Sequence, residues 1–205
     1  MSYASVGMTQ KPDVIAFPPT GFSGREASWR IGSGAQRFAT AQDALLTWGL
    51  HRAANLDVEV LHEGDPQGYR GIEFDSFGAG IKSVDAGAEI AYSSDGTAFI
   101  QPGTVVRVGG LWTPIEDVHD FRVIYVIRES RRCGFAMGTL EETPVSGEEF
   151  FGLEWRADDS VWAIVRSVTS VPESRWRWAL MPLIRLRQQL QMRANVRALS
   201  PARQG

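Results

Sequence analysis

The sequence is poor in cysteine and lacks long apolar runs, and each shortage excludes a class of protein. Cys133 is the single cysteine among 205 residues, so the chain forms no internal disulfide. No apolar run reaches the roughly 18 residues of a membrane-spanning helix. Residues 1–10 lack the basic and then apolar order of a signal peptide. We therefore expect a cytoplasmic protein.

Metal and cofactor motifs are also missing. No histidine forms a metal-ligand pair with another histidine or with Cys133, and the three are far apart: His51, His62 and His119. Gly32 and Gly34 resemble part of a phosphate loop, but no third glycine follows, and Ser33 is better interpreted as a helix N-cap. We expect no metal and no cofactor, and we expect Cys133 to be a small buried side chain.

Charge is distributed unevenly along the chain. The net charge is -3, yet seven arginines and no acidic residue follow Glu173, which leaves 14 basic and 24 acidic residues in the remainder. A basic terminal segment can meet nucleic acid or an anionic membrane, but it can equally lie across the acidic body of its own domain. We favour the internal explanation, so the composition gives no strong nucleic-acid signal.

Apolar periodicity predicts an α+β fold. Phe38, Ala41, Leu45 and Trp48 recur at helical spacing, which predicts an amphipathic helix over residues 35–54. Alternation predicts strands at residues 57–63, 104–108, 121–127, 133–140, 149–155 and 161–168, the later ones as an antiparallel meander. In the 121–127 strand, Tyr125 is expected on the same face as Phe121, Val123 and Ile127. A long helix is expected over residues 173–199, kinked or started by Pro182.

These elements indicate one domain. Residues 1–34 are rich in proline and glycine and are expected to form an extended arm, with one strand at most near residues 14–17. Residues 35–199 then form a single α+β domain with a glycine-rich insertion near residues 64–103, where strands are weak. Residues 200–205 are expected to be a frayed tail. The oligomeric state stays open.

A glycine-rich part of the meander carries a family signature. The pattern GF-x-YGTL, then HP, then GEE-x-F is matched by Gly134, Phe135, Gly138, Thr139, Leu140, Pro144, Gly147, Glu148, Glu149 and Phe151. The chain thereby resembles an uncharacterised family of bacteria and plants catalogued as domain of unknown function 1990. The family's tyrosine and histidine are here Met137 and Thr143, and its arginine after the last strand is Val171, so any role of those side chains is absent.

The order of elements looks like the helix-grip architecture of START and plant pathogenesis-related proteins. This resemblance implies a curved, mostly antiparallel sheet that wraps around the last helix and leaves a cavity for an apolar ligand. Some proteins of this architecture are cyclases or hydrolases, although a shared fold is a weak argument for a shared function.

Two adjacent glutamates of the signature are expected to face opposite sides of their strand. Glu149 shares the apolar side with Phe151 and Trp155, whereas Glu148 is expected at the rim or in solvent. Desolvation raises the pKa of a carboxyl group on an apolar face, which suits a general acid or base. The alternative is a structural ion pair between Glu149 and an arginine, for which the candidates are Arg122 and Arg128.

Tyr125 and His51 are the candidate helpers of Glu149 in proton transfer, although Tyr125 can equally be a core aromatic residue. Six large side chains are candidates for lining a ligand pocket or, alternatively, for a plain core: Trp48, Phe135, Met137, Phe151, Trp155 and Trp162.

Three functions follow from these observations. The leading hypothesis is binding of a small apolar or amphipathic molecule between the sheet and the terminal helix. The second is a cofactor-free enzyme, a cyclase, dehydratase or hydrolase of the same cavity, acting in secondary metabolism. The third is an interaction protein whose arginine-rich terminal helix contacts nucleic acid or a membrane.

Overall fold

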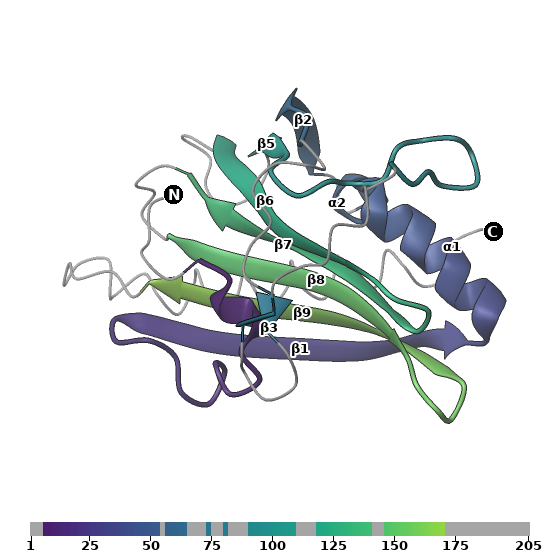
Figure 1. Ribbon diagram of the computed structural model, residues 1–205, viewed down its shortest axis with the longest axis horizontal. Helices are drawn as coiled ribbons and strands as arrows, with labels where there is room; N and C mark the ends of the chain where they lie inside the picture. Colours follow the sequence, from purple (N-terminus) through teal and green to yellow (C-terminus); the bar gives the residue numbers. More distant parts are fainter. Residues whose placement is uncertain are drawn as a thin grey trace.

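The computed structural model shows a curved antiparallel sheet of seven strands with two helices packed on one face (Figure 1). The strands lie in the order β1, β9, β8, β7, β6, β5, β2, and each neighbouring pair is antiparallel. This arrangement confirms the predicted α+β class. The structure describes residues 6–53, 56–64, 73–74, 80–81, 90–109, 118–140 and 146–170.

The sheet strands are β1 (Phe22–Ser33), β2 (Asp57–His62), β5 (Val105–Gly109), β6 (Val118–Arg128), β7 (Arg132–Thr139), β8 (Gly147–Trp155) and β9 (Ser160–Ser170). The other elements are the 3-10 helix η1 (Met8–Gln10), the helices α1 (Ala35–Leu46) and α2 (Gly49–Ala53), and the hairpin of β3 (Glu73–Phe74) and β4 (Gly80–Ile81). The predicted terminal helix, Pro182, the tail and most of the glycine-rich insertion lie outside the described residues.

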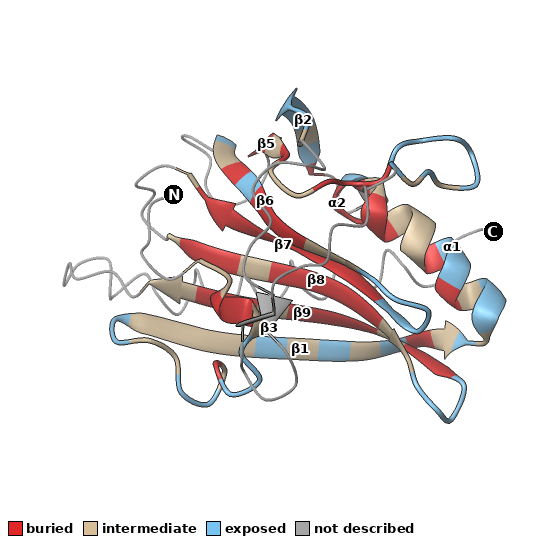
Figure 2. Cartoon of the chain, viewed as in Figure 1, coloured by how far each residue is buried: buried red, intermediate tan, exposed pale blue. Residues whose placement is uncertain are grey.

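The main hydrophobic core lies between the helices and one face of the sheet, which we call the inner face. Phe135 and Met137 of β7 and Phe151 and Leu153 of β8 belong to this face, and each is exposed by 2% or less. The predicted helical stripe of α1 packs against them through Phe38, Ala41 and Leu45. Figure 2 shows buried residues along β7, β8 and β9, whereas β1 and β2 at the edges carry exposed ones. Burial of each such side chain stabilises the fold by roughly 1.5–3 kcal/mol.

The opposite, outer face is covered at one end by the N-terminal segment, and η1 lies across β8 and β9 (Figure 1). Met8 and Val14 of this segment pack on Val168 of β9. Further along the face, the ring of Phe150 lies over Gly134: a methyl group there would meet Cε2 of Phe150 at 2.9 Å and the carbonyl oxygen of Phe151 at 2.4 Å. Gly134 therefore permits a close approach of β7 and β8 that a side chain would prevent.

The predicted helix over residues 35–54 is interrupted, which the periodicity did not show. Thr47 ends α1, Trp48 adopts a left-handed backbone with φ 64°, and α2 begins at Gly49. A methyl group at Gly49 would lie 2.7 Å from the carbonyl oxygen of Ala44, so the corner is too tight for a side chain there. The predicted N-cap at Ser33 is also wrong, because Ser33 ends β1 and Gly34 takes the cap position.

The strand expected near residues 14–17 is not there. Ala16 and Phe17 instead donate backbone hydrogen bonds to the carbonyl oxygen of Asp13, which bends the chain into a turn. The strand of this region is β1, which pairs with β9 along its length. Only Ala27, Trp29 and Ile31 alternate with polar residues in β1, and this short pattern lies within the proline- and glycine-rich residues 1–34, whose composition favours an extended arm.

The face assignment within β6 is wrong beyond Val123. A bulge lies between Val123 and Tyr125, where one extra residue shifts the pairing with β7. Tyr125 therefore turns to the outer face with Phe150, and Val126 packs on the inner face beside Phe135. The strands β2 and β5 to β9 otherwise lie within three residues of their predicted ends.

Candidate functional site

A polar row crosses the inner face next to the apolar core. The strand register places Ser167 of β9 and Met137 of β7 directly opposite Glu149 of β8, one on each side. Arg25 of the edge strand β1 lies opposite Ser167. In the next inward-facing row, Phe151 lies between Val165 and Phe135. The inner face thus passes from polar to apolar side chains within one step along the strands.

Glu149 faces this side of the sheet, as predicted. Its side chain is half-buried, and burial raises the pKa of the carboxyl group to about 7, although a hydrogen bond from Ser167 opposes the rise. The alternative ion pair does not form among the described residues: neither Arg122 nor Arg128 pairs with Glu149, because Arg122 lies opposite Gly138 and Arg128 opposite Cys133. Glu149 is therefore an inward carboxyl group whose described polar partner is a hydroxyl group.

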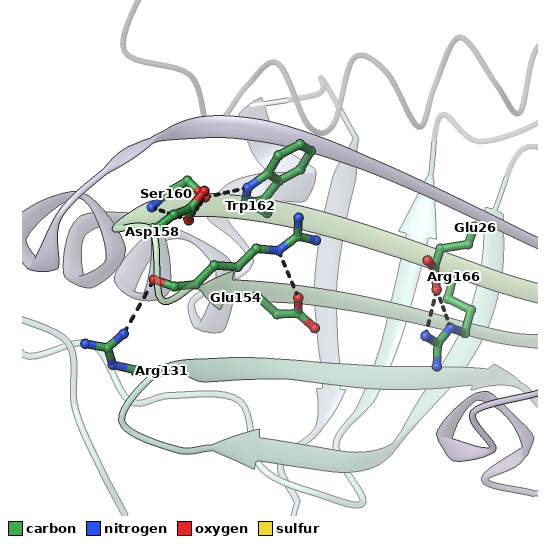
Figure 3. Close-up of polar contacts among 8 residues, drawn as sticks. Glu26, Arg131, Glu154, Asp158, Ser160, Trp162 and Arg166 are labelled. Carbon is green, nitrogen blue, oxygen red and sulfur yellow. Dashed lines mark hydrogen bonds and ion pairs between the residues drawn. The ribbon is translucent and has the colours of Figure 1, made fainter.

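Glu148 is not in solvent, which corrects the expectation for this residue. It is 0% exposed on the outer face and accepts hydrogen bonds from the backbone N–H groups of Gly7 (2.7 Å) and Thr9 (2.9 Å) and from the Thr9 hydroxyl. Arg166 donates to the carbonyl oxygen of Thr9 (2.8 Å) and pairs with Glu26 (2.6 Å) (Figure 3). Glu148 thus fixes the N-terminal segment to the sheet.

Tyr125 belongs to this outer network and not to the surroundings of Glu149. Its hydroxyl group hydrogen-bonds the Thr9 hydroxyl (2.8 Å), and its ring stacks on Phe150 with centroids 6.0 Å apart. Burial raises the pKa of the tyrosine hydroxyl well above its usual value. Because Tyr125 and Glu149 lie on opposite faces, the structure does not bring this predicted pair together.

His51, the other predicted helper, packs against the inner face from α2. It is 1% exposed, and its ring centroid lies 4.8 Å from that of Phe151, 5.4 Å from that of Trp48 and 5.9 Å from that of Phe135. Neither imidazole nitrogen has a hydrogen-bond partner among the described residues. Burial lowers the pKa of the imidazole to about 4, so His51 is neutral at pH 7.

The six candidate pocket residues separate into three places. Trp48, Phe135, Met137 and Phe151 lie together in the inner-face core. Trp155, at the end of β8, stacks with Phe38, donates its indole N–H to Asp159 (2.9 Å) and carries the Arg131 guanidinium over its ring at 4.4 Å.

Trp162 lies on the outer face, directly opposite Glu154 of β8 on one side and Arg30 of β1 on the other. Its indole N–H donates to the Ser160 hydroxyl (2.8 Å), which in turn donates to Asp158 (Figure 3). The guanidinium of Arg156 lies over its ring at 4.3 Å. Trp162 therefore does not line the same region as Phe151.

Sequence reasoning missed Ser167, which a stricter use of alternation finds. Val161, Ala163 and Val165 of β9 are inward and buried, so the next inward position, Ser167, is a polar residue on an apolar face. Cys133 is fully buried as expected, and burial raises the pKa of its thiol to about 12, which leaves it unreactive near pH 7.

Among the described residues, no helix has the length and apolar content to span a membrane, and no group of three or more metal-ligating side chains comes together.

Comparison with known proteins gives a family and a remote structural similarity. A family model described as "Domain of unknown function (DUF1990)" matches residues 2–100 and 86–198. No curated protein sequence matches the chain significantly.

Among solved structures, truncated norcoclaurine synthase from Thalictrum flavum is 12% identical, with a TM-score of 0.46 over 86% of this chain and 92% of that one. Ara h 8.0201 is 11% identical, with a TM-score of 0.47 over 87% and 98%. The hypothetical protein jhp0584 from Helicobacter pylori is 9% identical, with a TM-score of 0.47 over 96% of each chain. Similarities this remote assign no function.

Proposed function

The chain belongs to the DUF1990 family, whose description names no activity, and we propose that its function is to bind a small apolar or amphipathic molecule on the inner face of the sheet. The proposal rests on this chain's own side chains. The predicted opposite wall of the cavity, the helix over residues 173–199, lies outside the described residues.

Glu149 is the observation that carries the proposal. An exposed carboxyl group keeps an ordinary pKa, and a fully packed one has no accessible surface. Glu149 is desolvated enough to bring its pKa to about 7, yet it remains only half-buried and forms no ion pair with a described residue. This combination is typical of a side chain on the wall of a recess, where a ligand's polar group completes its hydrogen bonding.

The distribution of side chains favours an amphipathic ligand over a purely apolar one. The row of Arg25, Ser167 and Glu149 offers polar contacts at one end of the inner face. The adjacent row of Val165, Phe151 and Phe135 offers apolar contact to the body of the molecule. A ligand with one polar end and an apolar body matches both rows.

Native mass spectrometry of protein purified from its own host tests the binding proposal, because a retained molecule is identified by its mass. The same preparation, stripped of ligand, is then scanned by thermal shift against a panel of lipids and polyketides. Glu149→Ala removes the polar group and should lower the affinity for ligands with a polar end about tenfold, the value of one net hydrogen bond. Glu154→Ala, an exposed outer-face change on the same strand, is the control and should have no effect. No retained molecule together with no thermal shift would contradict the proposal.

The pKa of Glu149 favours one second candidate, a cofactor-free enzyme. A carboxyl group with a pKa of about 7 is half protonated near neutral pH and suits general acid or base catalysis of a cyclisation, dehydration or hydrolysis. If the bound molecule is a substrate, Glu149→Gln should retain binding and reduce turnover by about 10²–10⁴-fold. Turnover that survives the substitution would exclude this role for Glu149.

A further inference from the structure

The corner between α1 and α2 contains two energetically unfavourable features within four residues, a left-handed backbone and an unsatisfied buried polar side chain. Trp48 is a buried, non-glycine residue with a left-handed backbone, φ 64°. His51 is 1% exposed, and within the described part of the chain both its imidazole nitrogens lack a hydrogen-bond partner. Strained backbone and unsatisfied buried polar groups each lower stability, and they occur together mainly where a site needs them.

The surroundings of His51 are aromatic on three sides. Trp48 meets the imidazole edge to face at 70°, Phe151 does so at 65°, and Phe135 is tilted by 33°. Trp48 also contacts Phe135 directly, with centroids 5.1 Å apart. These rings supply no hydrogen bond to the imidazole, so its two nitrogens remain unsatisfied by the described residues.

The corner and Glu149 flank the same aromatic residue. Phe151 contacts His51 and lies two residues from Glu149 on the same face of β8. Alternate residues of a strand are about 6.6 Å apart, which is the length of one aromatic ring with its substituents. His51 and Glu149 are therefore both neighbours of Phe151.

We propose that His51 is a second polar contact of the ligand, which is a ring-bearing molecule with a hydroxyl or carbonyl oxygen at the end opposite its contact with Glu149. The inference rests on the proposed binding function and specifies its ligand class. The imidazole nitrogens are covered in the present arrangement, so the ligand reaches them by displacing a ring.

An isosteric pair of compounds tests the contact. We choose 2-naphthol and 2-methylnaphthalene, which differ by a hydroxyl group in place of a methyl group, and measure their affinities for the full chain by isothermal titration calorimetry. The wild type should bind 2-naphthol about tenfold more tightly, because the hydroxyl group satisfies the imidazole. His51→Leu, which has a similar volume, should bind the two compounds equally. Glu149→Gln should keep a preference for the hydroxyl group through His51.

A second measurement needs no variant and remains decisive if His51→Leu fails to fold. The ¹⁵N chemical shifts of the wild-type imidazole should change when 2-naphthol is added and stay constant with 2-methylnaphthalene. Unchanged shifts with both compounds, or a hydroxyl preference that survives His51→Leu, would overturn the inference while leaving the binding function intact. If neither naphthalene binds although a host molecule is retained, the ligand class is wrong. If nothing is retained and nothing binds, the binding function fails as well.

Discussion

At the scale of single residues, Glu149 and His51 respond to burial in opposite directions. Both favour the neutral form in the folded chain, but neutrality means a bound proton for the carboxyl group and a released proton for the imidazole. Burial raises the pKa of Glu149 from 4.5 to about 7 and lowers that of His51 from 6.5 to about 4. Their contributions to the pH dependence of stability therefore oppose each other between about pH 4.5 and 6.5.

The first prediction concerns His51. The folded state holds the imidazole neutral, so its contribution to stability is complete above pH 6.5 and falls as the pH is lowered towards 4, by roughly 3 kcal/mol in all. His51→Leu should remove this loss. Urea unfolding of wild type and variant at pH 7.5 and pH 4.5 measures it: the variant should gain stability relative to the wild type at the lower pH. An equal difference at both pH values would show that His51 does not titrate as a buried group.

The second prediction concerns Glu149 and has the opposite sign. The folded state favours the protonated carboxyl group, so the wild type loses stability as the pH rises from 4.5 through 7. Glu149→Gln imitates the protonated form. It should be more stable than the wild type by about 1–2 kcal/mol at pH 8, a value reduced for the group's accessible surface, and equal to it at pH 4. A variant less stable than the wild type at pH 8 would indicate a hidden ion pair.

At the scale of elements, adjacent residues of β8 have different roles on the two faces of the sheet. Glu149 faces the core side, and Glu148 holds the N-terminal segment on the outer face. The sequence indicates that Glu148 and Glu149 alternate, but it does not indicate the hydrogen-bond partners of Glu148. These partners, Gly7 and Thr9, are about 140 positions away, and no local sequence pattern predicts that they pack on β8. The sequence does not predict the bulge of β6 for a similar reason, because the bulge is a property of the pairing of β6 with β7 and not of either strand alone.

The third prediction tests the N-terminal attachment. Glu148→Ala leaves the part-buried N–H of Gly7 and the buried N–H and hydroxyl groups of Thr9 without their carboxylate acceptor, so it should destabilise the chain by about 3–5 kcal/mol. Glu154→Ala removes only an exposed ion pair with Arg156 at 3.6 Å, so it should cost less than about 1 kcal/mol. Chemical denaturation measures both, and equal losses would contradict the role of Glu148. Amide hydrogen exchange at residues 7–10 should accelerate only in Glu148→Ala.

At the scale of the whole molecule, the pattern of apolar residues predicts the fold class and the approximate ends of six of the seven sheet strands, because the inner face is built from regular alternation and one helical stripe. It was not enough for the candidate site. The periodicity predicts Trp48 within a continuous helix, whereas its backbone is left-handed and a side chain at the next residue, Gly49, would meet the carbonyl oxygen of Ala44. The bulge of β6 places Tyr125 on the face opposite to the predicted one, and the short alternation of β1 is concealed by the proline- and glycine-rich composition around it. Sites depend on such local exceptions, which only the packed chain determines.

The last prediction joins protonation of Glu149 to ligand binding. If the neutral carboxyl group is the binding-competent form, the apparent dissociation constant equals the intrinsic one divided by the protonated fraction. With a pKa of about 7, that fraction falls about tenfold between pH 6 and pH 8. The affinity for 2,6-dihydroxynaphthalene, whose second hydroxyl group is available to Glu149 and which is itself uncharged over this range, should fall by up to the same factor in the wild type and stay constant in Glu149→Gln. Calorimetry in buffers of different ionisation enthalpy should detect uptake of a proton on binding near pH 8 in the wild type alone. If the affinity is independent of pH in both proteins, Glu149 does not contact the ligand and His51 is its polar contact.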